Sequence, residues 1–66
     1  MTTLADAIPI EQARVRELLK RYHSIGPIGV FGAAMLERAM ANMDRALASG
    51  DIVEMLRAYE ALKECE

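Results

Sequence analysis

The sequence predicts an all-α fold: a small three-helix domain with a long central helix, in which the second and third helices form a hairpin. Apolar residues recur at helical spacing in three segments of the chain, as they do on one face of an amphipathic helix. Glycine and proline interrupt this pattern near residue 26 and at residue 50, as they do where helices end. No segment alternates apolar and polar residues in the manner of a strand.

The length limits the chain to one domain, which we place at residues 9–66, after a flexible tail formed by residues 1–8. A chain of 66 residues buries only about 60% of the surface that its unfolded form exposes, so its stability is marginal without support. A single cysteine, Cys65, and a single histidine, His23, argue against an internal disulfide and a closed zinc site. We therefore expect no cofactor or metal, and a homodimer or higher oligomer instead.

The first helix is expected to begin at Pro9, whose missing N–H costs nothing at a first helical position. Its apolar face consists of Val15, Leu18, Leu19 and Tyr22. The helix is expected to end near Gly26, because glycine suits a left-handed cap and Pro27 cannot continue the hydrogen-bond ladder.

The second helix, from about residue 27 to residue 49, is the central element, and its apolar residues form two adjacent stripes. The first stripe contains Gly29, Gly32, Ala33, Leu36, Met40, Met43 and Leu47. The second contains Ile28, Phe31, Met35, Ala39 and Ala46. One neighbouring helix cannot cover both stripes, so we expect part of the cover to come from another subunit. The residues predicted to pack in an oligomer or against a partner are Gly29, Phe31, Gly32, Ala33, Met35, Leu36, Met40, Met43, Leu47 and Tyr59.

The third helix is expected to run from Ile52 to about Glu64, after Gly50 has ended the second. Asp51 is its predicted N-cap, and Glu54, three residues later, completes an acidic variant of the capping box. The predicted apolar face contains Ile52, Met55, Leu56, Tyr59 and Leu62.

The sequence offers little for catalysis, and we predict that the protein is not an enzyme. His23 lies at a helix C-terminus, where an imidazolium meets the negative end of the helix dipole, and this role is favoured over a catalytic one. Glu37 and Asp44 share a helix face but are about 10 Å apart along its axis. They are typical of a solvated face rather than of a pair of catalytic carboxylates.

The net charge and the hydropathy of the chain limit the kinds of molecule that we expect it to bind. The net charge of −2 argues against a nucleic-acid binder, so a DNA-binding regulator is the least favoured hypothesis. No apolar run reaches the roughly 18 residues that span a bilayer, and the N-terminus lacks the pattern of a signal peptide. We expect a cytoplasmic protein without nucleic-acid or membrane partners.

The segment SIGPIGVFGAAM, residues 24–35, allows two interpretations. A glycine-rich helix start leaves backbone N–H groups free to hold a phosphate group. The residues of such a site would be Arg14, Arg16, Lys20, Arg21, His23, Gly26 and Gly29. Alternatively, the glycines leave a bare face for close packing of another helix, with Phe31 and Met35 in the adjacent groove. Glycine inside a helix costs roughly 1 kcal/mol relative to alanine, which implies a compensating contact, and we favour close packing.

From Val15 to Glu66 the chain resembles short proteins of Mu-like transposable phages and prophages that share an IGPxGxFGA core. The segments that carry the resemblance are IGPIGVFGAAM and ASGDIVEMLRAYEALKECE. The resemblance implies a small accessory protein that binds and inhibits a bacterial host protein. Our leading hypothesis is therefore a non-catalytic helical homo-oligomer that binds a host protein in the host cytoplasm. The alternative, from the glycine-rich segment, is a binder that sequesters a phosphate-containing nucleotide signal.

Overall fold

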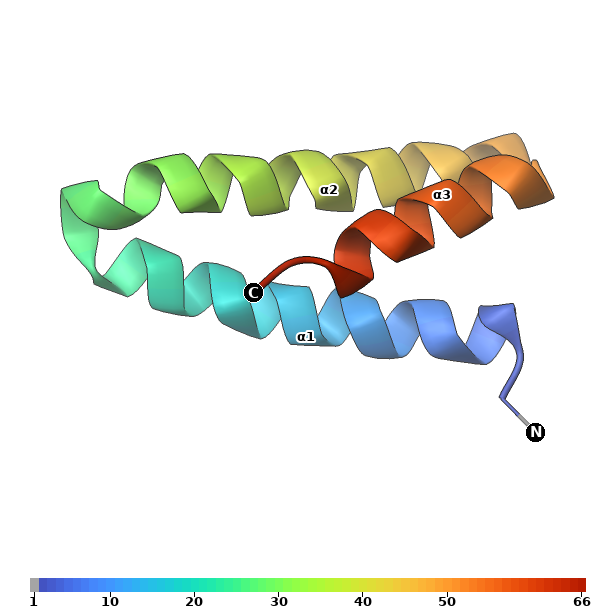
Figure 1. The fold of residues 1–66 in the computed structure, drawn as a ribbon, viewed down its shortest axis with the longest axis horizontal. Coiled ribbons are helices and arrows are strands. Elements are labelled where there is room, and N and C mark those ends of the chain that lie inside the picture. The colour runs from blue at the N-terminus through green and yellow to red at the C-terminus, as the bar shows by residue number, and fades with distance from the viewer. Residues whose placement is uncertain (1) are drawn as a thin grey trace.

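The computed structural model describes residues 2–66, in which three α-helices are joined by short turns (Figure 1). α1 spans Leu4–Ser24, α2 spans Val30–Ser49 and α3 spans Ile52–Lys63, and a 3-10 helix, η1 (Gly26–Gly29), lies between α1 and α2. α1 and α2 are antiparallel arms, and α3 turns back from the end of α2 toward the middle of α1 (Figure 1). The predicted all-α fold, with a long second helix packed against the third, is confirmed.

α1 begins well before Pro9, so the predicted helix start is wrong and most of the expected tail is helical. A capping box explains the earlier start. Oγ1 of Thr3 accepts from the N–H of Asp6 at 3.2 Å, and the Asp6 carboxylate accepts from the N–H of Thr3 at 3.4 Å. Pro9 removes one hydrogen bond inside the helix, and burial of Ile8, which is only 2% exposed, offsets that loss. Met1, also assigned to the tail, lies outside the described residues.

The turns between the helices depend on Gly26, Gly50 and Asp51, which the sequence predicted to end or begin helices. Gly26 and Gly50 adopt left-handed φ angles of 77° and 71°, which glycine reaches without steric cost. The carboxylate of Asp51 caps α3 by accepting two main-chain hydrogen bonds from its first turn. The predicted capping box is only half formed, because the N–H of Asp51 donates to the hydroxyl of Ser49 at 3.1 Å and not to Glu54.

The core lies where the three helices meet. Its buried apolar residues are Ile8, Val15, Ala33, Leu36, Ala39, Met43, Ala46, Ala58 and Leu62. α2 contributes members of both predicted stripes, and its alanines leave room for α3 to approach. Most of the apolar circumference of α2 is therefore covered within the same chain, by α1 on one side and α3 on the other.

Gly29 and Gly32, in the glycine-rich segment of residues 24–35, lie directly against α1. A β-carbon on Gly29 would stand 2.0 Å from the main-chain oxygen of Tyr22, and one on Gly32 would stand 2.7 Å from Cε1 of the same tyrosine. The glycines thus allow close packing, as the sequence led us to favour. The neighbour that contacts both glycines is α1 of the same chain, whereas the sequence predicted another subunit or a partner at these positions.

Candidate functional site

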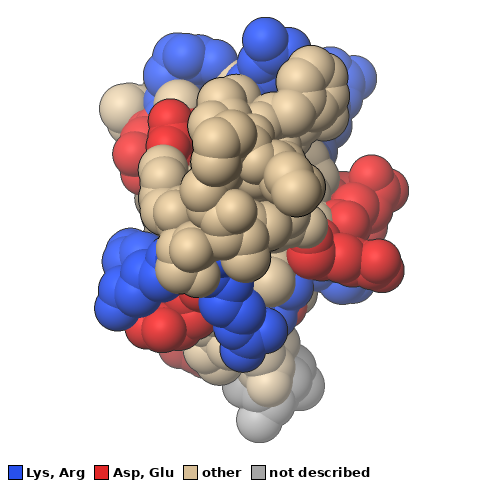
Figure 2. Space-filling view, turned by 90° about the vertical axis from the view of Figure 1, so that its left-hand side faces the viewer, with Lys and Arg blue, Asp and Glu red and all other residues tan. Residues whose placement is uncertain are grey.

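Large apolar side chains remain exposed at the end of the molecule where α1 connects to α2. Ile28 is 87% exposed and Phe31 is 80% exposed, and Ile25, Val30 and Met35 are each more than half exposed. Figure 2 looks onto this end and shows a continuous uncharged surface with basic and acidic side chains at its margin. We call these five residues the end patch.

The helical rotation explains why the end patch faces outward. Gly29 and Gly32 face inward because Tyr22 lies against them. Phe31 precedes Gly32 in α2, where one residue corresponds to about 100° of rotation. Ile28 precedes Gly29 in the 3-10 helix η1, where one residue corresponds to about 120°. Either rotation turns the side chain away from α1. The same close contact that seats α2 on α1 therefore forces the neighbouring apolar side chains into solvent.

The end patch is large for a chain of this size. Five side chains exposed to this degree present on the order of 600 Å² of apolar surface, the upper end of what a single patch on a typical monomer shows. Patches of this size with a charged margin are typical of binding surfaces. Such a patch is thus the first candidate for the functional surface.

A hollow of about 220 Å³ lies on α1 beside the end patch and is lined by Leu18, Arg21, Tyr22 and Ile25. Leu18 and Tyr22 are half-buried and pack against the core with their inner sides. The hydroxyl of Tyr22 donates to the main-chain oxygen of Glu66, which fixes the ring at its outer edge. Arg21 contributes the one charged group of the hollow.

The predicted packing residues divide into two groups by their exposure within the single chain. Buried or half-buried within the chain are Gly29, Gly32, Ala33, Leu36, Met40, Met43 and Tyr59. Exposed are Phe31, Met35 and Leu47. The first group lies under α1 or α3, since these helices cover most of both stripes. Phe31, Met35 and Leu47 are therefore the predicted packing residues that are most exposed in the single chain.

Site prediction from the sequence missed Ile25, Ile28 and Val30 as members of the exposed surface. Periodicity placed Ile28 on the second stripe but not among the predicted packing residues, and Ile25 and Val30 lie outside both stripes. A signal was nevertheless present: no Asp, Glu, Lys or Arg occurs over residues 24–36. A charge-free segment that includes a turn exposes apolar side chains, because a turn lies at the surface.

Arg14, predicted as part of an anion site, instead caps the C-terminal end of α3. Its guanidinium donates to the main-chain oxygens of Leu62 at 2.7 Å, Lys63 at 3.4 Å and Cys65 at 2.8 Å, and its Nε donates to the carboxylate of Glu11 at 2.7 Å. The last carbonyl groups of a helix have no partner within it. The side chain is therefore engaged in holding α3 on α1.

The remaining residues of the predicted anion site do not converge. Nζ of Lys20 pairs with a carboxylate one turn away at 3.1 Å, and Nε2 of His23 lies 3.3 Å from Glu37. Arg16 is exposed and lies about 15 Å along α1 from Gly26. Among the described residues, the basic side chains and the glycine-rich turn therefore do not form one phosphate-sized site.

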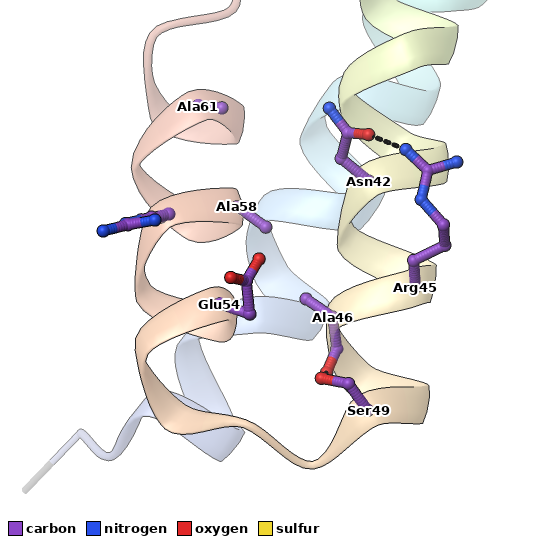
Figure 3. Close-up of a pocket in the computed structure, with 8 residues that line it drawn as sticks. Asn42, Arg45, Ala46, Ser49, Glu54, Ala58 and Ala61 are labelled. Carbon is purple, nitrogen blue, oxygen red and sulfur yellow. Dashed lines mark hydrogen bonds between the residues drawn. The ribbon is translucent and has the colours of Figure 1, made fainter.

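A groove of about 500 Å³ opens between α2 and α3 (Figure 3). Ala46 and Ala58 point into it from the two helices, and the carboxylate of Glu54 lies between the levels of these two alanines (Figure 3). Arg45 donates to the side-chain amide one turn before it. The hydroxyl of Ser49 donates to the oxygen of Ala46 at 2.7 Å. This bond engages the hydroxyl proton of Ser49 with the main chain of α2.

Cys65 is half-buried and lies against the middle of α1, where its main-chain oxygen accepts from Arg14. Burial raises the pKa of its thiol, the guanidinium of Arg14 acts in the opposite direction, and the carboxylates of Glu64 and Glu11 raise the pKa further. The thiol accordingly keeps its proton at neutral pH and donates to the oxygen of Ala61 at 3.4 Å. A protonated thiol of this kind is a weak nucleophile and a poor metal ligand.

The wider comparisons add no relative. Across residues 2–66, no three His, Cys, Asp or Glu side chains gather as ligands for a metal ion. None of the helices in this part of the chain has the length and apolar character that crossing a membrane requires.

Comparison with known protein families, with curated proteins and with solved structures finds no match to this chain.

Proposed function

We propose that this protein is a non-catalytic binding protein that engages another protein through the end patch. The observation that carries the proposal is the exposure of Ile28 and Phe31, at 87% and 80%, on an end of the molecule held by the close contact of α1 with α2. Burial of one such side chain stabilises a complex by about 1.5–3 kcal/mol. Aromatic anchors of this kind are enriched in the centres of protein interfaces.

The proposed partner is a bacterial host protein, and the proposed place of action is the host cytoplasm. The support is the resemblance of the chain to short proteins of Mu-like phages. The IGPIGVFGAAM segment that carries this resemblance runs from Ile25 to Met35, so it contains every residue of the end patch. An accessory protein that occupies a site on its target through an exposed apolar surface fits the role of an inhibitor.

The test compares the wild type with Phe31→Ser and with the matched control Ile10→Ser. Ile10 is 65% exposed on α1 but lies outside the end patch. Each protein is immobilised, bacterial lysate is passed over it, and a retained protein is purified and titrated by calorimetry. We expect equal affinity for the wild type and Ile10→Ser, and an affinity about 30-fold weaker for Phe31→Ser. Equal retention by Phe31→Ser, or no specific retention by the wild type, contradicts the proposal.

A further inference from the structure

We infer that, in the absence of a partner protein, two copies of this chain cover each other's end patch, with Phe31 of each copy seated in the hollow of the other. The inference goes beyond the proposed function because it names a second copy as the resting occupant of the surface. A host protein would then displace that copy. The inference depends on two features at the same end of one molecule. The side chain of Phe31 is exposed there, and the hollow on α1 is open there.

Phe31 has the properties of a side chain that inserts into a partner. It is 80% exposed and takes no part in lining the hollow of its own chain. The hollow measures about 220 Å³, and a cavity of about 150 Å³ already accepts a benzene molecule. One phenyl ring from a second copy therefore matches the available space.

The lining of the hollow is suited to an aromatic ring. Leu18 offers an apolar wall, Tyr22 offers a second ring for an offset or edge-to-face contact, and the guanidinium of Arg21 can lie over the inserted ring. Tyr22 is held in place by Gly32 on one side and by its bond to Glu66 on the other. A hollow that is already formed loses little conformational freedom when it is filled.

A two-fold arrangement accommodates both contacts, because Phe31 and the hollow lie on the same end of each chain. Each copy gives one Phe31 and receives one, so the contact closes after two copies and does not extend into a filament. Two end patches together would bury roughly 1,200 Å², which reaches the lower bound of a specific interface. The margin carries charges of both signs (Figure 2), so it does not present a field of one sign that would repel a second copy.

Sedimentation velocity with three variants tests the arrangement. Phe31→Ala removes the inserted side chain, Ile25→Trp fills the hollow from its rim, and Ile10→Ala is the exposed control outside the patch. We expect wild type and Ile10→Ala to dimerise equally, and each of the other two to raise the dissociation constant by about 100-fold. Circular dichroism checks that every variant remains folded, as expected since Ile25 and Phe31 are exposed.

Mixing the two defective variants tests the exchange itself. A heterodimer of Phe31→Ala and Ile25→Trp restores one of the two contacts, because the intact Phe31 of one copy meets the intact hollow of the other. We therefore expect the mixture to dimerise more tightly than either variant alone. A mixture that associates no better than its components overturns the exchanged arrangement.

Further outcomes separate this inference from the proposed function. A wild type that stays monomeric up to roughly 100 µM, but still requires Phe31 to bind a host protein, overturns the inference and leaves the function standing. A dimer that depends on Phe31 but binds no host protein supports the inference and overturns the function. Monomers that float with vesicles of anionic phospholipid in a Phe31-dependent manner identify a lipid surface as the occupant, which overturns the inference.

Discussion

The ring of Tyr22 lies so close to Gly32 that a β-carbon at this glycine would stand 2.7 Å from ring atom Cε1. Gly32→Ala must displace the ring, and overpacking of this kind destabilises by about 1–3 kcal/mol, against a gain of about 1 kcal/mol in helix propensity. We expect a net loss of about 1 kcal/mol in urea unfolding. Gly29→Ala should be worse, because its β-carbon would meet the main-chain oxygen of Tyr22, which cannot rotate away.

Exposed Ala34 on the same helix provides the control for both glycine variants. Ala34→Leu adds more volume than either of them but meets solvent, and we expect a change within about 0.5 kcal/mol. In the double variant Gly32→Ala with Tyr22→Leu, the smaller side chain should relieve part of the overpacking. Equal losses for Gly29→Ala and Ala34→Leu would contradict the close contact between α1 and α2.

Removing the guanidinium of Arg14 should release the end of α3. Arg14→Met keeps most of the aliphatic stem but deletes the donors to Leu62 and Cys65. Since hydrogen bonds to charged groups contribute about 1.5–3 kcal/mol, we expect a loss of about 2 kcal/mol in urea unfolding, with faster amide exchange in the last turn of α3. Arg16→Met, at an exposed neighbour on the same helix, should change stability by less than about 0.5 kcal/mol.

Asp51 caps the N-terminus of α3, and substitutions at Asp51 and Glu54 test this cap. Asp51→Ala removes the acceptor of two main-chain hydrogen bonds and should destabilise the fold by about 1 kcal/mol. Glu54→Gln should cost only a few tenths of a kcal/mol through the helix dipole, because the side chain of Glu54 does not complete the capping box. Thermal unfolding of both variants checks the order. A larger effect of Glu54→Gln than of Asp51→Ala would contradict this order.

The thiol of Cys65 makes stability depend on pH. Burial raises its pKa, so above the ordinary thiol pKa the unfolded chain loses the proton first. The free energy of unfolding therefore falls as pH rises from the ordinary thiol pKa through the raised one, and the contribution is fully present below that window. Urea unfolding at a series of pH values from about 7 to about 10.5 should show a shallower decline for Cys65→Ala than for the wild type. Parallel declines would contradict the raised pKa.

Local chemistry made much of the fold predictable. Gly26, Gly50 and Asp51 act through their own backbone or side chain within a few residues, and each has the predicted role in ending or starting a helix. The error at the start of α1 was also local. Thr3 and Asp6 carry the spacing of a capping box, but Pro9 offered a competing start signal. Pro9 is tolerated within the helix because tertiary burial of its neighbour compensates for it.

The candidate site could be predicted only in part, because it depends on which helix face is left uncovered. Periodicity places Phe31 and Ala39 on one stripe of α2, but Ala39 is buried and Phe31 is exposed. The difference is the path of α3, which crosses the later turns of α2 and then turns toward α1 before it reaches the end patch (Figure 1). Similarly, no local pattern indicates that Arg14 meets the carbonyl groups of residues 62–65.

The contacts of Arg14 join positions 48 to 51 residues apart in the chain, whereas α2 and α3 are separated by only two residues. Contacts that close long loops are entropically costly and form late, so we expect the hairpin of α2 and α3 to be assembled before α1 engages α3. A bond made after the folding barrier changes the rate of unfolding and hardly changes the rate of folding. The guanidinium of Arg14 therefore sets how long the native fold persists, not how quickly it is reached.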